Sequence, residues 1–103
     1  MNQTVDLVIA GDHSAARAAA VAALRCGQSV LVVLWVDDAR RGRRLRRSLL
    51  EDARTDGGQL KVITGAEVVC VDGVEGVEAV VVRHAATGRL SAVNTSAFAS
   101  FDG

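Results

Sequence analysis

"VIAGDHSAA", residues 8–16, decides the fold, because an apolar run changes here into a turn and then into a helix. The apolar run covers 5–10 and predicts a strand buried on both faces. Residues 14–25 are rich in alanine, the best helix former, and Gly27 follows them as a left-handed helix stop. A second apolar run at 29–36 predicts another buried strand. Strand, helix and strand in this order indicate a βαβ unit with parallel strands.

The remaining chain first repeats this alternation and then changes to short strands. Asp37 or Asp38 is the expected cap of a second helix at 39–54, and residues 60–63 form the expected third strand. Turn-forming stretches such as DGVEG and ATG then separate the last predicted strands, which lie at 67–71, 77–83, 89–93 and 97–101. The pattern is therefore βαβαβ followed by a small antiparallel β addition. It predicts a three-layer α/β sandwich with helices on both faces of the parallel sheet.

The composition indicates one domain, 1–103, with a single core. The residues are 50% hydrophobic and only 3% aromatic, so valine, leucine and alanine must build the core. The formal net charge is zero, which argues against general binding of nucleic acid. The longest apolar run, 30–36, is far shorter than the ~20 residues of a membrane-spanning helix, so no membrane partner is expected.

Cysteine and histidine usage favours a cytoplasmic protein without a metal site. The N-terminal residues lack the basic region and the long apolar run of a signal peptide. Cys26 and Cys70 form no C-x-x-C, so both thiols are expected to be reduced and buried. His13 and His84 lie far apart in the sequence and do not indicate a metal cluster.

Several stretches resemble one family. Three consecutive stretches together resemble the nucleotide-binding Rossmann unit of flavin-dependent oxidoreductases: DLVIAG, the predicted helix of small residues, and SVLVVL. In particular, they resemble the NAD(P)H domain of thioredoxin-reductase-like pyridine nucleotide–disulfide oxidoreductases. Residues 60–90 are similar to the third strand and following hairpin of that domain, and residues 95–103 to the strand that returns to the flavin domain. The resemblance covers nearly the whole chain and implies a three-layer Rossmann-like sandwich.

The dinucleotide-binding turn of this family is altered here. Its G-x-G-x-x-G/A motif falls on Gly11, His13 and Ala16, a register that fits the following helix better than one starting at Ala10. The resemblance implies that Gly11 keeps the tight turn and that Ala16 permits close helix–strand packing. His13 replaces the glycine that lets backbone approach the pyrophosphate, and Asp12 adds a negative charge beside it. A weakened or lost phosphate site is therefore expected, despite the helix N-terminus that follows.

The segment after the second predicted strand departs further from the family pattern. The family's H-R-R-x-x-x-R motif, which holds the 2′-phosphate of NADPH, falls on residues 34–40, where only Arg40 matches. The strand tip is Leu34, so no acidic residue stands there to hold a ribose. Trp35 is able to stack on an adenine, although a core or interface tryptophan is favoured. Asp37 is favoured as a helix cap.

Two further patterns admit more than one interpretation. Ser14 begins the first helix, where a cap is favoured over a hydrolase nucleophile, because G-x-S-x-G would need a small residue at Asp12. RRGRRLRR, residues 40–47, is either a solvated helix face or a patch that binds an anion or a partner. Nucleic acid is the less favoured partner, because no aromatic residues are interleaved with the arginines.

Two functions remain open from the sequence. The favoured one is a degenerate, non-catalytic Rossmann-like subunit, acting as a structural or regulatory component of an oxidoreductase assembly or as a homodimer. The alternative is a functional NAD(P)H- or FAD-binding module of a flavin-dependent oxidoreductase. The altered turn favours the non-catalytic subunit. The 103 residues also include no C-x-x-C and no flavin domain to accept a hydride. The isolated chain is expected to hold no cofactor beyond weakly bound NAD(P)H or FAD, and a protein partner or self-association is expected.

Overall fold

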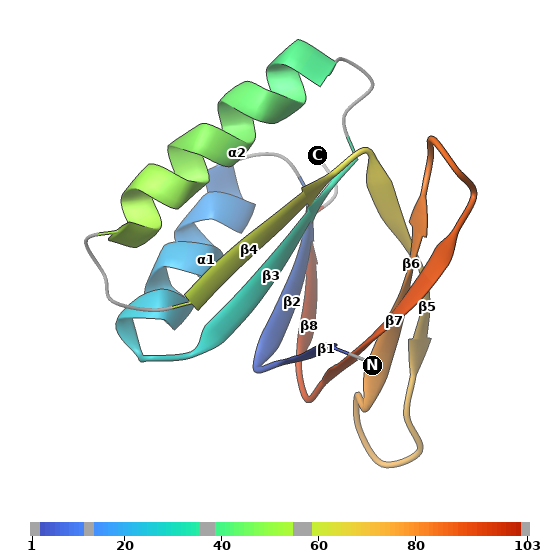
Figure 1. Cartoon of the computed structure of the whole chain (residues 1–103). Helices are drawn as coiled ribbons and strands as arrows, with labels where there is room; N and C mark the ends of the chain where they lie inside the picture. Colours follow the sequence, from blue (N-terminus) through green and yellow to red (C-terminus); the bar gives the residue numbers. More distant parts are fainter. Residues whose placement is uncertain (1–2, 12–13, 36–38, 55–58, 102–103) are drawn as a thin grey trace.

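The computed structural model describes residues 3–11, 14–35, 39–54 and 59–101. Two helices and eight strands follow one another along this part of the chain (Figure 1). They are β1 (Gln3–Val5), β2 (Leu7–Gly11), α1 (Ser14–Arg25), β3 (Ser29–Leu34), α2 (Ala39–Arg54), β4 (Gln59–Thr64), β5 (Ala66–Asp72), β6 (Ala79–His84), β7 (Leu90–Thr95) and β8 (Phe98–Phe101). Both helices have the predicted bounds, and each predicted strand from β3 onward is found within two residues of its expected ends.

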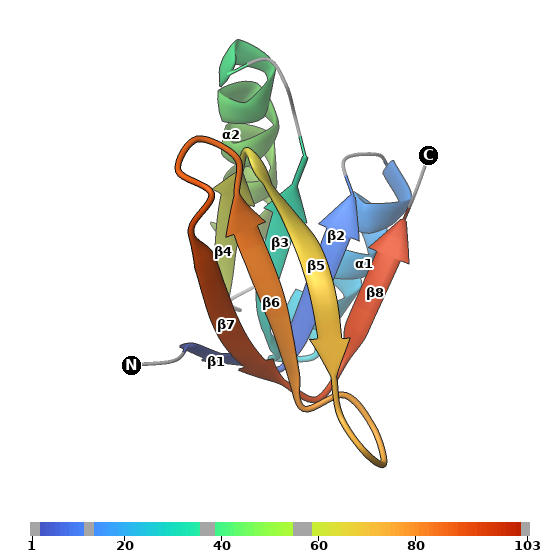
Figure 2. The same cartoon turned by 90° about the vertical axis from the view of Figure 1, so that its right-hand side faces the viewer.

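The strands form two sheets that pack against each other. One sheet has the order β4-β3-β2-β8 and is parallel throughout. The other has the order β1-β7-β6-β5, in which β5, β6 and β7 form an antiparallel meander. Figures 1 and 2 show the helices on one face of the parallel sheet and the second sheet on its other face. The predicted fold class is confirmed: an α/β, three-layer Rossmann-like sandwich, βαβαβ with a small antiparallel β addition.

The prediction of helices on both faces of the parallel sheet is wrong. The chain moves from β2 to β3 to β4 in one direction across the sheet, through α1 and then α2. Right-handed crossovers that step in the same direction place their helices on the same face. The opposite face would then expose apolar side chains, and the antiparallel sheet covers them.

The central strand β3 shows how both faces are buried. Its residues Val30, Val32 and Leu34 pack into the core beneath the helices, whereas Leu31 and Val33 pack against the antiparallel sheet. All five are at most 2% exposed. Successive side chains of a strand point to opposite faces, so an uninterrupted apolar run requires cover on both sides.

The predicted first strand, 5–10, is in fact two strands. Val5 belongs to β1, which pairs in parallel with β7, whereas β2 begins at Leu7 in the other sheet. The chain bends at Asp6, whose N–H donates to the carbonyl oxygen of Ser29 at 3.0 Å. The Ser29 N–H in turn donates to Oδ2 of Asp6 at 2.8 Å. These bonds join the amino ends of β2 and β3 and direct β1 toward the second sheet.

The end of α1 confirms the predicted helix stop. Gly27 has a φ of +79°. Its N–H donates to the carbonyl of Leu24 at 2.9 Å, and the N–H of Gln28 donates to that of Ala23 at 3.2 Å. This pair of bonds is a Schellman motif, which satisfies carbonyls that the helix leaves open. The expected cap of α2 at Asp37 or Asp38 lies outside the described residues.

The prediction of buried thiols is wrong. Cys26 and Cys70 are both free and both exposed. Cys26 follows the last residue of α1, and Cys70 lies on β5, the edge strand of the antiparallel sheet, so neither position is covered on all sides. In the part of the chain that the structure describes, no helix is long and apolar enough to cross a bilayer.

Candidate binding cleft at the carboxyl edge of the parallel sheet

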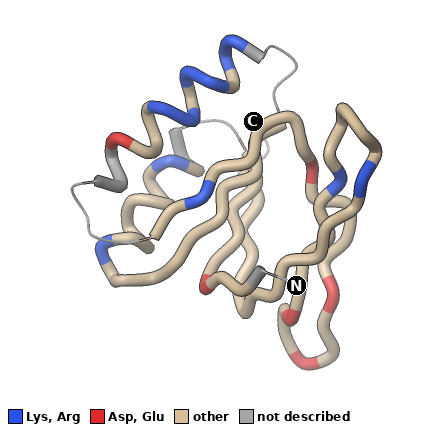
Figure 3. The backbone as a smooth tube through the Cα atoms, viewed as in Figure 1, with Lys and Arg blue, Asp and Glu red and all other residues tan. Residues whose placement is uncertain are grey.

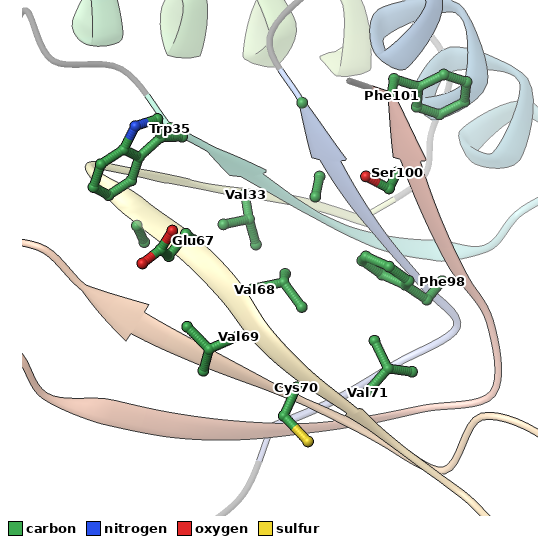
Figure 4. A pocket seen from close by; sticks show the side chains of 13 residues that line it. Val33, Trp35, Glu67, Val68, Val69, Cys70, Val71, Phe98, Ser100 and Phe101 are labelled. Carbon is green, nitrogen blue, oxygen red and sulfur yellow. The ribbon is translucent and has the colours of Figure 1, made fainter. Parts of the chain in front are cut away.

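The carboxyl ends of the four parallel strands lie at one edge of the sheet, where α/β proteins of this kind bind ligands. A cleft of about 610 Å³ starts at this edge and runs between the two sheets (Figure 4). It is lined by β8, an edge strand of the parallel sheet, and by β5, an edge strand of the antiparallel sheet. Figure 2 shows these two strands. The lining residues are Ala10, Gly11, Val33, Trp35, residues 66–71, Phe98, Ser100 and Phe101.

Apolar side chains form most of the cleft wall. Figure 4 shows Val68 and Val71 of β5 on one side and Phe98 of β8 on the other. Val69 and Val71 are each 44% exposed, which is high for valines on a strand of a packed sheet. The β5–β6 pairing shifts register between Val68 and Cys70, so Val69 is the extra residue of a β-bulge. The cleft is therefore an apolar groove whose side chains remain partly open to water.

Trp35 and Glu67 lie toward one end of the cleft (Figure 4). Trp35 directly follows β3 and is 49% exposed. Glu67 lies near it in Figure 4 and forms an ion pair with Arg83, its cross-strand partner on β6. The sequence favoured a core or an interface position for Trp35. The core position is wrong, because about half of the residue's surface is exposed to solvent. The interface position and the stacking role remain predictions.

Cys70 is not poised as a nucleophile. Its Sγ donates a hydrogen bond to Oδ1 of Asp72 at 3.5 Å. This bond, and the negative charge of Asp72, raise the pKa of the Cys70 thiol. The thiolate, which is the reactive form, is disfavoured as a result.

Gly11, the first glycine of the altered motif, is the last residue of β2 and pairs with Phe101 of β8. Its φ is +139°, and a Cβ built on it would lie 2.6 Å from the carbonyl oxygen of Phe101. A side chain would therefore collide with the neighbouring strand. The sheet itself requires glycine here, whether or not a phosphate binds at the turn.

The structure brings some predicted site residues together and separates others. Gly11 and Trp35 line the same cleft. Ala16 is 3% exposed in the core beneath α1, in keeping with close helix–strand packing, and Arg40 is exposed on α2 and does not line the cleft. Ser14 begins α1, and Asp12 and His13 lie outside the described residues.

Reasoning from the sequence missed the apolar wall on β5. The signal was present: VVCV, residues 68–71, is apolar without interruption, whereas a strand with one solvated face alternates. Such a run on the edge strand of a meander indicates more apolar surface than one packed face requires. Phe98 could not be found in this way, because only the β2–β8 pairing brings it opposite β5.

The arrangement suits binding better than acid–base chemistry. Among the described lining residues, the Glu67 carboxylate is held in an ion pair and the Cys70 thiol is held protonated. The open ring of Trp35 and the valine wall are complementary to planar or aliphatic groups. The cleft volume lies within the 300–1,000 Å³ range of small-molecule sites, or fits the side chains of a protein partner.

Comparison with known proteins finds similarity at the level of fold. No protein-family model and no curated protein sequence matches this chain. The thioredoxin reductase from Giardia duodenalis superposes with a TM-score of 0.74 at 16% identity, over 99% of this chain and 32% of that one. The thioredoxin reductase of T. acidophilum gives 0.74 at 14% identity, over 96% and 31%. The myxobacterial chondrochloren halogenase CndH, an FAD-dependent halogenase, gives 0.72 at 13% identity, over 98% and 38%.

These similarities show that the chain has the fold of a domain present in thioredoxin reductases and in an FAD-dependent halogenase. The resemblance noted in the sequence is confirmed to that extent. The chain spans only about a third of the length of each of these proteins.

Proposed function

We propose that this chain is a non-catalytic Rossmann-like unit with a degenerate phosphate-binding turn, and that it serves as a structural or regulatory part of an oxidoreductase assembly. A protein partner covers the cleft between β5 and β8. One observation carries the proposal: the apolar wall of the cleft is open to water, with Val69 and Val71 each 44% exposed.

Covering this wall supplies a driving force for association. Complete burial of a valine side chain is worth about 1.5–3 kcal/mol, so burying the exposed part of Val69 and of Val71 contributes roughly 1 kcal/mol each. Trp35 adds a large, half-exposed ring at the end of the same groove. Charge does not oppose contact here, because Arg83 balances Glu67 at the rim. Cys26 and Cys70 are free thiols and fit the reducing cytoplasm, which we propose as the compartment.

A second candidate function has support of its own. The cleft contacts both Gly11 and Trp35 at the carboxyl edge of the parallel sheet, the place where open α/β sheets bind nucleotides. Under this alternative the chain is a functional NAD(P)H- or FAD-binding module of a flavin-dependent oxidoreductase. The Trp35 ring would stack on a base, and Arg40 would lie on the helix that follows.

The experiment is isolation of the native assembly from its source, with its mass and its visible absorbance recorded. The proposal expects the chain to be recovered in a complex with a larger flavoprotein. Val71→Asp places a charge in the cleft and is expected to release that partner. Leu90→Asp is the matched control, because Leu90 is 61% exposed and does not line the cleft. Retention of the partner by Val71→Asp would contradict the proposal, and stoichiometric NAD(P)H or FAD on the pure, wild-type chain would favour the second candidate.

A further inference from the structure

The loop between β5 and β6 carries an apolar tip surrounded by acidic residues. Val74 is 93% exposed, the highest value among the large exposed hydrophobic residues of the described chain. Asp72, Glu75 and Glu78 lie within four residues of it, and all three are exposed. Figures 1 and 2 show this loop extending beyond both sheets.

Backbone hydrogen bonds fix the two ends of this loop. The N–H of Glu78 donates to the carbonyl of Asp72 at 2.8 Å and closes the loop. The carbonyl of Glu78 accepts from the N–H of Thr95 at 3.0 Å, which ties the loop to the end of β7. The two ends of the loop are therefore fixed to the antiparallel sheet, and Val74 lies between them at the exposed tip.

A second, smaller cleft has complementary properties. It has a volume of about 270 Å³ and lies between α2 and β4. Leucine and other aliphatic residues form its floor, and Arg46 and Lys61 are the two charged residues in its lining, which comprises Leu31, Arg46, Leu50, Leu60, Lys61, Val62 and Ile63. Neither Arg46 nor Lys61 forms an ion pair with any residue that the structure describes.

The two features lie on opposite sides of the molecule. Figure 3 shows the arginine-rich helix α2 and the acidic β5–β6 loop far apart, so the loop cannot reach the cleft of its own chain. We infer that the Val74 loop of one copy docks into the α2–β4 cleft of a second copy. This inference rests on the proposed function as a protein-binding unit and names a second copy of the chain as one partner.

Two independent properties match in this arrangement. The exposed valine fits an aliphatic floor, and the acidic residues beside it face Arg46 and Lys61. A flexible polyanion would satisfy the two cations but would leave the apolar floor open. The zero net charge of the chain removes the general repulsion that would oppose association of identical copies. Because the two surfaces differ, the contact is head-to-tail and repeats until a ring closes or a filament grows.

A charge-exchange experiment tests the inference by sedimentation velocity over a micromolar range of protein, at low and at high salt. The wild type is expected to form species larger than a dimer at low salt and to dissociate at high salt. The cleft variant is Arg46→Glu with Lys61→Glu, and the loop variant is Glu75→Arg with Glu78→Arg. Each is expected to be monomeric alone, and an equimolar mixture is expected to associate again, since each loop then faces a cleft of opposite charge.

Two single substitutions complete the design. Val74→Ser leaves every charge in place and is expected to weaken association by about tenfold. Arg89→Glu changes an exposed arginine outside the cleft as a control for Arg46→Glu, and is expected to associate like the wild type. Val74 is almost fully exposed, so its replacement cannot unfold the core.

Several results would overturn the inference. They are a monomeric wild type at every concentration, an isologous dimer that the charge-exchange variants leave intact, and a mixture that stays monomeric. Binding of polyphosphate in place of a second copy would identify the cleft as an anion site instead. The native-assembly experiment, repeated with Val74→Ser, separates the two proposals: retention of the larger partner by this variant leaves the proposed function standing even if self-association is absent.

Discussion

Gly11→Ala tests whether the first glycine of the altered motif is required by the sheet. The new Cβ would lie 2.6 Å from the carbonyl oxygen of Phe101 and 3.2 Å from its Cβ. The first distance is far below van der Waals contact, and the atom concerned belongs to the backbone of β8, so no side-chain rotation relieves it. The φ of +139° adds strain for any residue with a side chain.

The expected loss of stability is the sum of two contributions. A strained backbone conformation costs about 1–3 kcal/mol, and overpacking of a well-packed site costs a further ~1–3 kcal/mol. We expect a loss near 3 kcal/mol, because β8 is an edge strand that can shift slightly and relieve part of the collision. In a chain of this size, such a loss lowers the Tm by roughly 15 °C.

The assay is urea unfolding followed by far-UV circular dichroism, with two other glycines as controls. Gly27→Ala has the left-handed φ of +79° but nothing within 4 Å of the new Cβ, so it should lose only about 1 kcal/mol. Gly42→Ala lies inside α2 with its Cβ 3.4 Å from that of Thr64, and should gain about 0.5–1 kcal/mol from helix propensity.

A Gly11→Ala variant within ~0.5 kcal/mol of the wild type would refute this reasoning, because β8 would then not constrain the position. We expect Gly42→Ala to be the most stable protein, followed by the wild type, then Gly27→Ala and finally Gly11→Ala. This order distinguishes steric collision at Gly11 from a general effect of removing glycines. Confirmation would mean that Gly11 by itself is no evidence for phosphate binding.

The remaining predictions concern ligands and the exposed thiol. Asp12→Gly combined with His13→Gly should raise the affinity for NADH and NADPH several-fold in calorimetry, since removing one charge near a diphosphate is worth on the order of 1 kcal/mol. In that background, Arg40→Ala should lower the affinity for NADPH more than the affinity for NADH. Equal losses of affinity would exclude a contact with the 2′-phosphate. The pure 103-residue chain should be colourless and should not reduce disulfides or dyes with NADPH, whereas turnover with a bound yellow flavin would disprove this. Because Asp72 raises the pKa of the Cys70 thiol, Asp72→Asn should lower that pKa and speed alkylation of Cys70 at mildly alkaline pH; an unchanged rate would show that the hydrogen bond has no influence.

Much of the fold could be predicted because its signals are local. The helices at Ser14–Arg25 and Ala39–Arg54 were predicted from alanine content and from capping and stop signals, and the parallel strands from short apolar runs between them. The bend at Asp6 could not be predicted, because it depends on hydrogen bonds to Ser29, which is 23 residues away. The predicted burial of Cys70 was wrong for a similar reason, because its exposure depends on which strands lie at the sheet edges, and Cys26 is exposed because it lies just beyond the end of α1.

The candidate site was predictable only in part. Gly11 and Trp35 were found because Gly11 follows one predicted strand and Trp35 lies near the end of the next, and strands of one parallel sheet end at one edge. Arg40 was paired with them by motif spacing, but it lies on α2 outside the cleft. The roles predicted for Asp12, His13 and Ser14 stay predictions.

The sequence by itself determined the order of helices and strands and the need for cover on both faces of the parallel sheet, because backbone propensity and apolar runs act over neighbouring residues. Only the tertiary structure decided what provides that cover and where it stays open. Val71 and Phe98 lie 27 residues apart and face one cleft, because the chain passes after β7 from the antiparallel to the parallel sheet, where β8 pairs with β2. That pairing depends on packing and hydrogen bonds between distant segments, which no local pattern contains.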